Sequence, residues 1–418
     1  MKHLKILADD VTGAADTAAR CRQFGMPATI FLGVPASPLP PGALAFTSDS
    51  RHLRPEEAAR RTREVAASIP ASDARWYKKI DSTVRGNIGS EVDALLDLLD
   101  EPAAVVCPAF PAHDRGLRDG YLEAPGFAPR DVHLPSLLCR QSRYPVGAIP
   151  LPDVRGGELA AQMKCAQQEI AGAADSRRLL LVVDALSEED LDGVVRAQQE
   201  ALPDALLCGS AGLAGALARR IGPQAGLPEA GSVGLPATQD IQPRIRTALL
   251  VMGSGSRAAH RQIAFLLDTG SKLQTGKQSR GSGPQLSVSR MLVSPETGPD
   301  AVAALDPAQG VWLLQQPLPE PGAVLEGKEA RRRADHLAGI GAAAFERRRP
   351  DLLVLVGGDT AMPILERLGV ELLTVTRELL PGMPLCSAVI GGRPALVSIK
   401  PGNFGGRDTL LQLLAVAG

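Results

Sequence analysis

Residues 4–25 read LKILADDVTGAADTAARCRQFG, and this stretch contains the pattern that decides the fold. LKILA is a short apolar run of the kind that forms a buried strand. The residues after it predict a helix from about residue 12 to Phe24, with Gly25 just past its end, where glycine commonly terminates helices. A strand followed at once by a helix is the repeating unit of α/β folds.

The same pattern recurs along the chain. Continuous apolar runs typical of parallel strands covered on both faces are found at residues 28–33, 43–48, 75–80, 103–109 and 179–185. A second series starts with RTALLVMG and ends with ALVSIKPGNFGG. The sequence therefore predicts an α/β protein with two domains and mainly parallel sheets.

A segment rich in glycine and proline separates the two series. Residues 223–245 show neither helical nor strand periodicity, which is typical of a linker. We expect an N-terminal domain over residues 1–222 and a C-terminal domain over residues 246–418, with an interdomain cleft as the ligand site. Residues 275–285, TGKQSRGSGPQ, are predicted to form a surface loop.

The overall composition excludes several classes of protein. Of 418 residues, 44% are hydrophobic and 22% are charged, and the formal net charge is -1. This balance argues against nucleic acid or an anionic membrane as the main partner, because both favour a basic surface. The six cysteines show no CxxC spacing, and no apolar run reaches the length of about 18 residues that a membrane span needs. We expect a cytoplasmic protein.

Two adjacent acids follow the first predicted strand. Asp9 and Asp10 are expected at the carboxyl end of a parallel strand, where ligands of open α/β sheets gather. Asp10 alone could be explained as the cap of the following helix. A cap needs only one acid, so Asp9 calls for another role, and the pair suits hydroxyl groups, a cation or a proton to be removed.

The stretch KKIDSTVRGN, residues 78–87, mixes cations, hydroxyls and a carboxylate. In a strand, Lys78 and Lys79 point to opposite faces, so only one of them lines a given pocket. Asp81 is expected at the strand end, with Arg85 in the next turn and a helix starting near Asn87. A cation there can hold a substrate carboxylate while Asp81 accepts a hydroxyl proton. The alternative is surface charge with a capping hydroxyl.

Glycine-rich turns mark the second half, although neither GxxxxGK[ST] nor GxGxxG is found. The turns are GSGS at 253–256, GGDT at 357–360 and KPGNFGG at 400–406. Small residues let the backbone approach a ligand, and a helix N-terminus offers N–H groups to anions. Each could be a mere turn, but three in one predicted domain favour nucleotide binding. Pro363 is expected in the first turn of the helix after GGDT, with Gly369 past its end.

Taken together, these motifs resemble the four-carbon acid sugar kinases over almost the whole chain. Besides the stretches already quoted, the resemblance rests on SDSR at 48–51, CPAFPAHDRGLRDG at 107–120 and CGSAGLA at 208–214. It implies an ATP-dependent enzyme that phosphorylates threonate, erythronate or a 3-oxo-tetronate, with Mg²⁺ accompanying the ATP. The 4-hydroxyl is the expected acceptor.

The resemblance also implies which residues form the site. The expected substrate contacts are Asp9, Asp10, Arg51, Lys78, Lys79, Ile80, Asp81 and Arg85. The expected nucleotide contacts are Ser254, Ser256, Gly357, Gly358, Asp359, Thr360, Gly402 and Asn403. Asp81 or Asp9 would accept the hydroxyl proton, while Arg51 and one of the two lysines would anchor the carboxylate. No metal ligands are assigned.

Two other functions stay open at this point. One is a non-catalytic sugar-acid sensor on a kinase fold, and the other is a sugar-acid dehydrogenase or isomerase, which the lack of GxGxxG disfavours. The arginine clusters at 331–333 and 347–349 are interpreted as solvated helix faces rather than as an anion site. Neither the stereoisomer of the substrate nor the oligomeric state, a homo-oligomer included, follows from the sequence.

Overall fold

The computed structural model describes residues 3–35, 38–72, 74–124, 132–174, 176–222, 245–275, 287–317 and 327–417. The chain divides into two compact units, residues 1–234 and 235–418. The linker predicted at 223–245 and the surface loop predicted at 275–285 lie outside the described residues, apart from residues 245 and 275. The limits of the two domains therefore stay a prediction.

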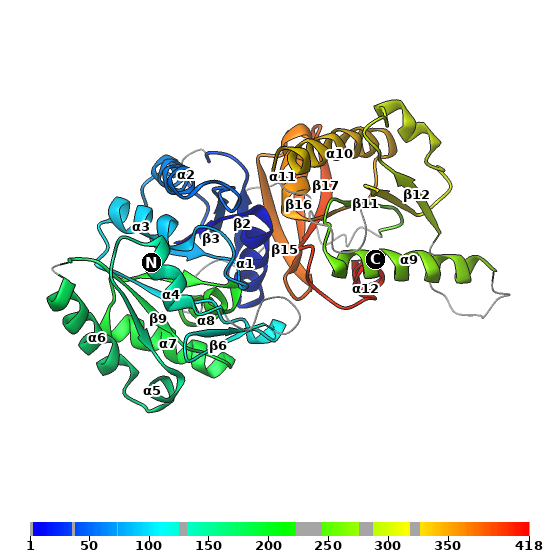
Figure 1. Cartoon of the computed structure of the whole chain (residues 1–418). Coiled ribbons are helices and arrows are strands. Elements are labelled where there is room, and N and C mark those ends of the chain that lie inside the picture. The colour runs from blue at the N-terminus through cyan, green and yellow to red at the C-terminus, as the bar shows by residue number, and fades with distance from the viewer. Residues whose placement is uncertain are drawn as a thin grey trace. The chain divides into compact units, whose positions relative to one another are not determined.

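The first unit is a parallel sheet with helices on both faces (Figure 1). Its strand order is β2-β3-β1-β4-β10-β5-β9-β8, and every pair of neighbours is parallel. Helices α2, α3 and α4 pack together along one face, and α1, α7 and α8 pack together along the other. The elements are β1 His3–Ala8, α1 Val11–Gln23, β2 Ala28–Phe31, β3 Gly42–Thr47, α2 Pro55–Ser68, β4 Ala74–Lys79, α3 Ile88–Leu99, β5 Ala103–Cys107, β6 Gly116–Arg118, β7 Tyr121–Glu123, α4 Leu134–Gln141, β8 Val146–Ile149, α5 Leu151–Arg155, α6 Leu159–Ala174, β9 Leu179–Val183, α7 Glu188–Ala201, β10 Leu206–Gly209 and α8 Ala211–Ile221.

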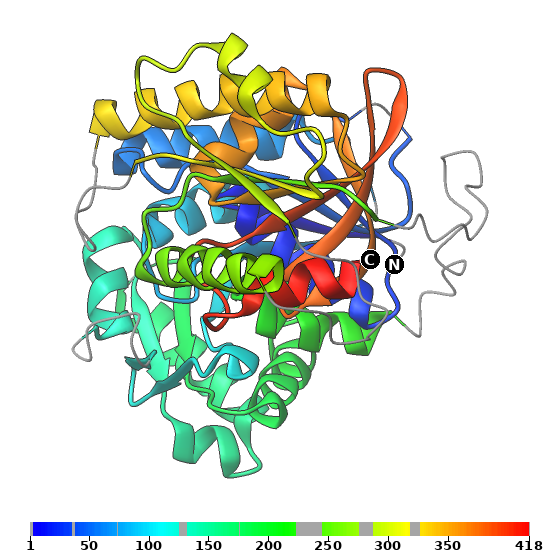
Figure 2. The same cartoon turned by 90° about the vertical axis from the view of Figure 1, so that its right-hand side faces the viewer.

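The strands of the second unit follow the order β12-β13-β11-β14-β17-β16-β15. The first five strands are parallel, while β16 and β15 are antiparallel to their neighbours. Helices α9 and α12 lie side by side on one face, and α10 and α11 pack together on the other (Figure 2). The elements are β11 Ala248–Met252, α9 Arg257–Thr275, β12 Val288–Leu292, β13 Val311–Gln315, α10 Gly327–Arg348, β14 Leu352–Val356, α11 Gly358–Arg367, β15 Leu372–Leu380, β16 Met383–Ile390, β17 Arg393–Lys400 and α12 Thr409–Ala417.

These strand arrangements confirm the predicted fold class, α/β with mainly parallel sheets. The first helix is confirmed within one residue at each end. Three predicted strands, at 28–33, 103–109 and 179–185, end two residues early. In the second of them the strand stops before Pro108, which has no N–H to donate to the sheet. The interdomain cleft stays a prediction.

The helix after GGDT begins and ends differently from the sequence-based expectation. α11 already starts at Gly358, so Pro363 lies inside the helix and not in its first turn, which corrects the prediction. The helix can start this early because Gly357 adopts a φ of 101°, a conformation that glycine reaches without strain. Gly369, with a φ of 66°, lies past the end as expected.

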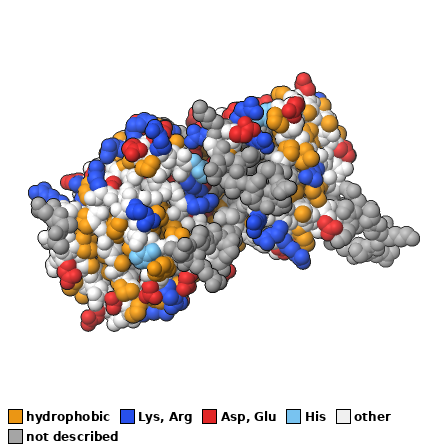
Figure 3. All heavy atoms as spheres, in the orientation of Figure 1, with side chains coloured by type: hydrophobic (Ala, Val, Ile, Leu, Met, Phe, Trp, Pro, Cys, Tyr) orange, Lys and Arg blue, Asp and Glu red, His pale blue; other side chains and the backbone are white. Residues whose placement is uncertain are grey.

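None of the helices in the described part of the chain is long and apolar enough to cross a bilayer. On the face shown in Figure 3, basic and acidic side chains are both widely distributed, in keeping with a formal net charge of -1.

Candidate active site

Loops of the first unit meet at the carboxyl edge of its sheet. In the register of the central strands, Ala8 of β1 pairs with Thr47 of β3 and with Lys79 of β4. The three strands therefore end at one level, and the loops that follow them are neighbours. These loops carry most of the predicted substrate contacts, and the structure brings those residues together.

Arg51 lies at the centre of this cluster. Its Nε and Nη2 atoms donate to the two carboxylate oxygens of Asp9 at 2.7 and 2.8 Å, and its Nη1 donates to Asp10 at 2.5 Å. Its Nη2 also lies 4.0 Å from an oxygen of Asp81, and the Arg51 side chain is only 10% exposed. One buried guanidinium thus holds three carboxylates that come from two different loops.

Asp10 has the capping role that the sequence left as an alternative, and a second role besides. Its carboxylate accepts the backbone N–H of Gly13 at 2.7 Å and so caps α1. The same side chain pairs with Arg51. Asp9 takes no part in the cap, and it is only 3% exposed at the strand end.

Asp81 is held by partners of its own. Arg85 donates to both carboxylate oxygens, from Nε at 2.7 Å and from Nη2 at 3.0 Å, and the hydroxyl of Thr83 also donates to Asp81. The Asp81 side chain is 9% exposed, whereas that of Arg85 is 55% exposed. Because Arg85 is largely in solvent, it is the partner that can turn away when a ligand reaches Asp81.

Both acids stay ionised at neutral pH. Burial tends to raise the pKa of Asp9, but Arg51 and the two neighbouring lysines outweigh it, so the pKa is lowered. Burial likewise opposes ionisation of Asp81, yet Arg51, Arg85 and Thr83 lower its pKa well below the usual range. Each carboxylate is therefore suited to orienting a hydroxyl group, and it is a weak base as long as its cation stays in contact.

The two lysines of β4 point to opposite faces, as predicted. Lys78 is fully buried and forms an ion pair with Glu91 of α3 at 2.6 Å. Lys79 lies on the α1 side, where a Cβ placed on Gly13 would lie 3.1 Å from its Nζ. Its Nζ donates to the backbone carbonyl of Ile80 at 2.9 Å, and no carboxylate of the described residues forms an ion pair with it. Lys79 is therefore the lysine of this pair with charge to offer a ligand.

Ile80 does not fit the predicted role of a substrate contact. Its side chain is buried in the hydrophobic core, and its N–H donates to the carbonyl of Gly209 at 2.9 Å. This hydrogen bond extends the pairing of β4 with β10 by one residue beyond the strand, while the side chain faces the hydrophobic core. Its backbone carbonyl still contributes, because it accepts the hydrogen bond from Lys79.

Two buried charged residues of this region were missed by sequence reasoning. Glu91 is 1% exposed. Its carboxylate accepts a hydrogen bond from the hydroxyl of Ser50 and forms an ion pair with Lys78. The sequence signal that could have identified Glu91 is a single acid among the apolar positions of a predicted helix. Arg115, 2% exposed, donates to the hydroxyl of Ser82 and comes from the quoted 107–120 motif.

In the second unit, the three glycine-rich turns meet at the carboxyl edge of the sheet. β11, β14 and β17 are parallel neighbours, and each turn follows one of them. Ser256 Oγ donates to the carbonyl of Gly402 at 2.6 Å, and the N–H of Gly357 donates to the carbonyl of Lys400 at 3.0 Å. The predicted nucleotide contacts, with Asn403 next to Gly402, thus form one group.

Glycine is required where these turns touch. A Cβ on Gly402 would lie 1.9 Å from Ser254 Oγ, and a Cβ on Gly253 would lie 1.7 Å from Thr360 Oγ1. Real Cβ atoms do not come this close to other atoms, so a side chain at either position would force the loops apart. No side chain of the described residues caps the start of α11, so the backbone N–H groups of its first turn suit phosphate.

One hydroxyl of these loops has no hydrogen-bond partner in the described part of the chain. Thr360 is 2% exposed, and its Oγ1 has no hydrogen-bond partner among the described residues. Asp359 is exposed in the first turn of α11, next to Gly358. The described residues contain no group of three or more His, Cys, Asp and Glu side chains that could hold a metal. A Mg²⁺ ion here would need most of its ligands from elsewhere.

Lys400 is a buried cation beneath the same loops. It is completely buried at the end of β17, and its Nζ donates to the carbonyl of Pro401 at 3.0 Å. No ion pair to it is found among the described residues. Burial lowers the pKa of Lys400 to about 7, well below the usual range for a lysine.

We expect the variant Lys400→Met to have a flatter dependence of stability on pH. In the wild type the unfolded chain takes up the lysine proton below about pH 10.5, while the folded chain takes it up only near pH 7. The free energy of unfolding should therefore fall as the pH drops from about 10.5 to 7, by a few kcal/mol. Urea unfolding of both proteins at pH 7, 8 and 9 measures the difference. Parallel pH curves would show that Lys400 is not a strained buried charge.

Family models match both halves of the chain. Residues 4–217 match the family described as the sugar-binding N-terminal domain, and residues 249–410 match the nucleotide-binding C-terminal domain. The chain is 30% identical to the 3-oxo-tetronate kinase of Methylobacterium radiotolerans, over 97% of both chains. It is also 31% identical to the D-threonate kinase of Cupriavidus necator, over 97% of this chain and 95% of that one.

The chain belongs to the four-carbon acid sugar kinase family. The family predicted from the motifs is thereby confirmed. A crystal structure of a Salmonella typhimurium LT2 protein, 24% identical, shares the fold with a TM-score of 0.73 over 99% of this chain and 98% of that chain. Within this family, the charged cluster of the first unit falls in the sugar-binding domain, and the glycine turns fall in the nucleotide-binding domain.

Proposed function

We propose that this tetronate kinase family member transfers the γ-phosphoryl group of ATP to a hydroxyl group, the 4-hydroxyl, of a four-carbon sugar acid. The observation that carries the proposal is the pair of strand-end clusters, one with carboxylates and cations and one with tightly packed glycine turns. The names of its relatives support the substrate class. Phosphoryl transfer needs mainly positioning and charge neutralisation, and both clusters supply these.

Lys79 is our candidate for anchoring the substrate carboxylate. The sequence left the choice between two lysines open, and Lys78 is already neutralised by Glu91. Arg51 was expected to share this role, but three of its nitrogen atoms donate to Asp9 and Asp10. We therefore assign Arg51 to holding the acids in place.

Asp81 is our candidate for orienting the acceptor hydroxyl. Its ionised carboxylate can accept the hydroxyl hydrogen once Arg85 turns toward solvent, and the proton can pass to it as the new bond forms. Asp9 would support the same hydroxyl from the neighbouring strand. The transfer also requires that the acid and the nucleotide meet, so the predicted interdomain cleft remains part of the proposal.

The glycine turns are our candidate phosphate site. Backbone N–H groups at the starts of α9 and α11, the hydroxyl of Thr360 and the charge of Lys400 would bind the triphosphate. Mg²⁺ would neutralise phosphate charge, held by phosphate oxygens and water with Asp359 as the nearest protein carboxylate on these turns.

A coupled assay of ADP release tests this function. The purified protein is supplied with ATP, Mg²⁺ and, in turn, D- and L-threonate, D- and L-erythronate and the 3-oxo acids. We expect acid-dependent ADP release with at least one of them, and a product phosphorylated at the 4-hydroxyl. Thermal stabilisation by an acid with no ADP formed would instead indicate a sugar-acid sensor.

Gly402→Ala is expected to weaken ATP binding by at least tenfold. The new methyl group would lie 1.9 Å from Ser254 Oγ and would push two phosphate-binding turns apart. In the double variant Gly402→Ala/Ser254→Gly the obstructing side chain is gone, so part of the affinity should return. Calorimetric titration with ATP measures both variants. Equal affinity of Gly402→Ala and wild type would remove these turns from the nucleotide site.

A further inference from the structure

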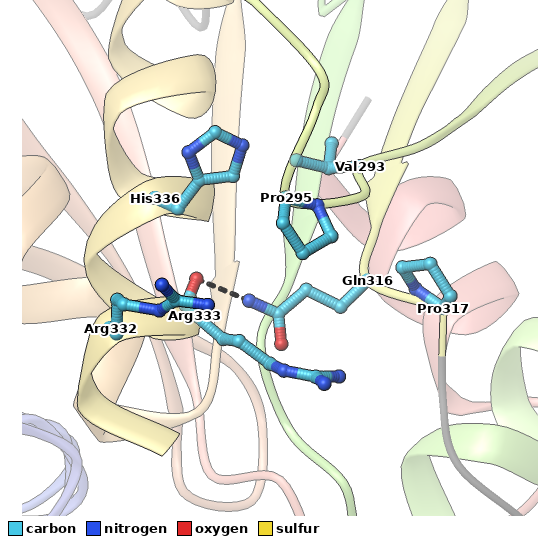
Figure 4. A pocket seen from close by; sticks show the side chains of 7 residues that line it. All are labelled: Val293, Pro295, Gln316, Pro317, Arg332, Arg333 and His336. Carbon is cyan, nitrogen blue, oxygen red and sulfur yellow. Dashed lines mark hydrogen bonds between the residues drawn. The ribbon is translucent and has the colours of Figure 1, made fainter. Parts of the chain in front are cut away.

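A separate pocket lies on the second unit. It has a volume of about 160 Å³ and is formed by the loops after β12 and β13 and by the first turns of α10 (Figure 4). The residues that matter here are Pro295, Gln316, Pro317, Arg332, Arg333 and His336. The proposed function has so far assigned no role to any of them.

The pocket lies on the same edge of the sheet as the proposed phosphate site. β12, β13, β11 and β14 are consecutive parallel neighbours, so the loops after all four strands leave from one edge. The connection from β11 runs to β12 in one direction along the sheet. The connection from β13 runs to β14 in the opposite direction. Ligands of open α/β sheets bind outside the carboxyl ends of the strands where the connections diverge in this way. A ligand bound at residues 253–256 can therefore extend along this edge toward the pocket.

The size of the pocket suits one part of a nucleotide. Sites that hold a whole ligand of drug size are typically about 300–1,000 Å³, so a volume of about 160 Å³ accommodates only a fragment such as a nucleobase. The rings of Pro295 and Pro317 provide apolar walls. Arg332, whose side chain is 72% exposed, brings a planar guanidinium that can stack on a base.

The charge of the pocket is lower than its arginines suggest. Glu329 accepts from Arg333 Nε at 2.8 Å and lies 3.3 Å from Arg332 Nε. One carboxylate thus offsets part of the charge of both guanidinium groups. An anion would therefore bind more weakly here than beside two arginines that have no carboxylate partner. The pocket favours a neutral planar ligand instead.

The hydrogen bonds within the pocket determine which of its atoms can still accept a hydrogen bond from a ligand. Gln316 donates from Nε2 to the backbone carbonyl of Arg333, which fixes the amide and leaves Oε1 as an acceptor (Figure 4). His336 Nε2 lies 3.0 Å from the carbonyl of Ser294, and because a carbonyl only accepts, this nitrogen carries the hydrogen. With the hydrogen on Nε2, Nδ1 is the ring nitrogen that can accept a hydrogen bond.

We propose that this pocket binds the adenine ring of ATP and that Gln316 Oε1 accepts a hydrogen bond from its 6-amino group. The assignment rests on the proposed kinase function and adds the base specificity of its nucleotide. A base with an oxygen at position 6 would place that acceptor against the acceptor Gln316 Oε1, so no hydrogen bond could form between them. The site therefore discriminates against inosine triphosphate, which differs from ATP at this position.

Calorimetric titrations of the full chain with ATP and with inosine triphosphate test the assignment. The wild type should bind ATP about tenfold more tightly, a difference of about 1.4 kcal/mol. Gln316→Met keeps the size of the side chain and removes the acceptor, so ATP affinity should fall about tenfold while inosine triphosphate affinity stays unchanged. Gln412→Met, an exposed glutamine of α12, is the matched control and should bind both nucleotides as the wild type does.

Several outcomes would overturn the pocket assignment without touching the kinase function. Equal affinity of the wild type for the two nucleotides would do so, even if the Gln316 variant failed to fold. An unchanged preference of Gln316→Met for ATP over inosine triphosphate would also overturn it. If Arg332→Ala lost the same affinity for both nucleotides, the pocket would be an anion subsite instead. Conversely, a wild type that prefers ATP through Gln316 but forms no ADP with any tetronate would uphold the pocket and reject the kinase.

Discussion

Asp81→Asn is expected to lower kcat with the preferred tetronate by about 10²-fold or more. The substitution keeps the shape of the side chain and removes the charge that would orient the acceptor hydroxyl. Stability should fall as well, because the lowered pKa of Asp81 means that its charge stabilises the fold through Arg51 and Arg85. Steady-state kinetics at saturating ATP and acid, together with urea unfolding, separate the two effects.

Asp93→Asn is the matched control for this prediction. Asp93 is a buried carboxylate of α3 in the same unit, and it accepts hydrogen bonds from Ser142 and from the backbone of Arg143. Burial raises its pKa, so removing its charge costs little. The control should keep normal kcat. An Asp81→Asn enzyme with near-normal turnover would reject Asp81 as the group that handles the acceptor hydroxyl.

The arrangement of loops at the strand ends was predictable from the sequence. Apolar runs identified the parallel strands, and parallel strands place the residues that follow them on one edge. Asp9 and Asp81 were therefore expected at one edge, Arg51 was expected with them from the family resemblance, and the structure brings the three together. The same reasoning grouped the three glycine turns of the second unit.

The choice of partners within each cluster was not predictable. Arg51 lies 42 positions from Asp9, and only the folded geometry shows that it is committed to Asp9 and Asp10. The antiparallel strands β15 and β16 were also missed, although Gly391 and Gly392, with φ of 55° and 74°, are typical of the tight turn that joins β16 to β17. The arginines at 331–333 were interpreted as a solvated face, because the loops that complete the pocket come from distant strands.

Arg51→Ala is expected to lower the free energy of unfolding by about 3–5 kcal/mol, the usual cost of leaving a buried charge without its partner. The role that the family resemblance implied for Arg51, anchoring the substrate carboxylate, would instead have predicted a raised KM for the acid. In the structure, however, removal of Arg51 leaves Asp9, Asp10 and Asp81 close together without the cation that holds them. Activity should fall with stability, because Asp9 and Asp81 would repel one another and move.

Two further variants identify the cause of this loss. Arg60→Ala removes an exposed pair with Glu64, whose side chains are 61% and 50% exposed, and should cost no more than about 1 kcal/mol. The double variant Arg51→Ala/Asp9→Asn removes the uncompensated charge as well, so it should regain part of the lost stability. Urea unfolding measures all three proteins. If Arg51→Ala unfolds like the wild type and only the KM for the acid rises, Arg51 contacts the substrate directly, and the assignment of the carboxylate to Lys79 is wrong.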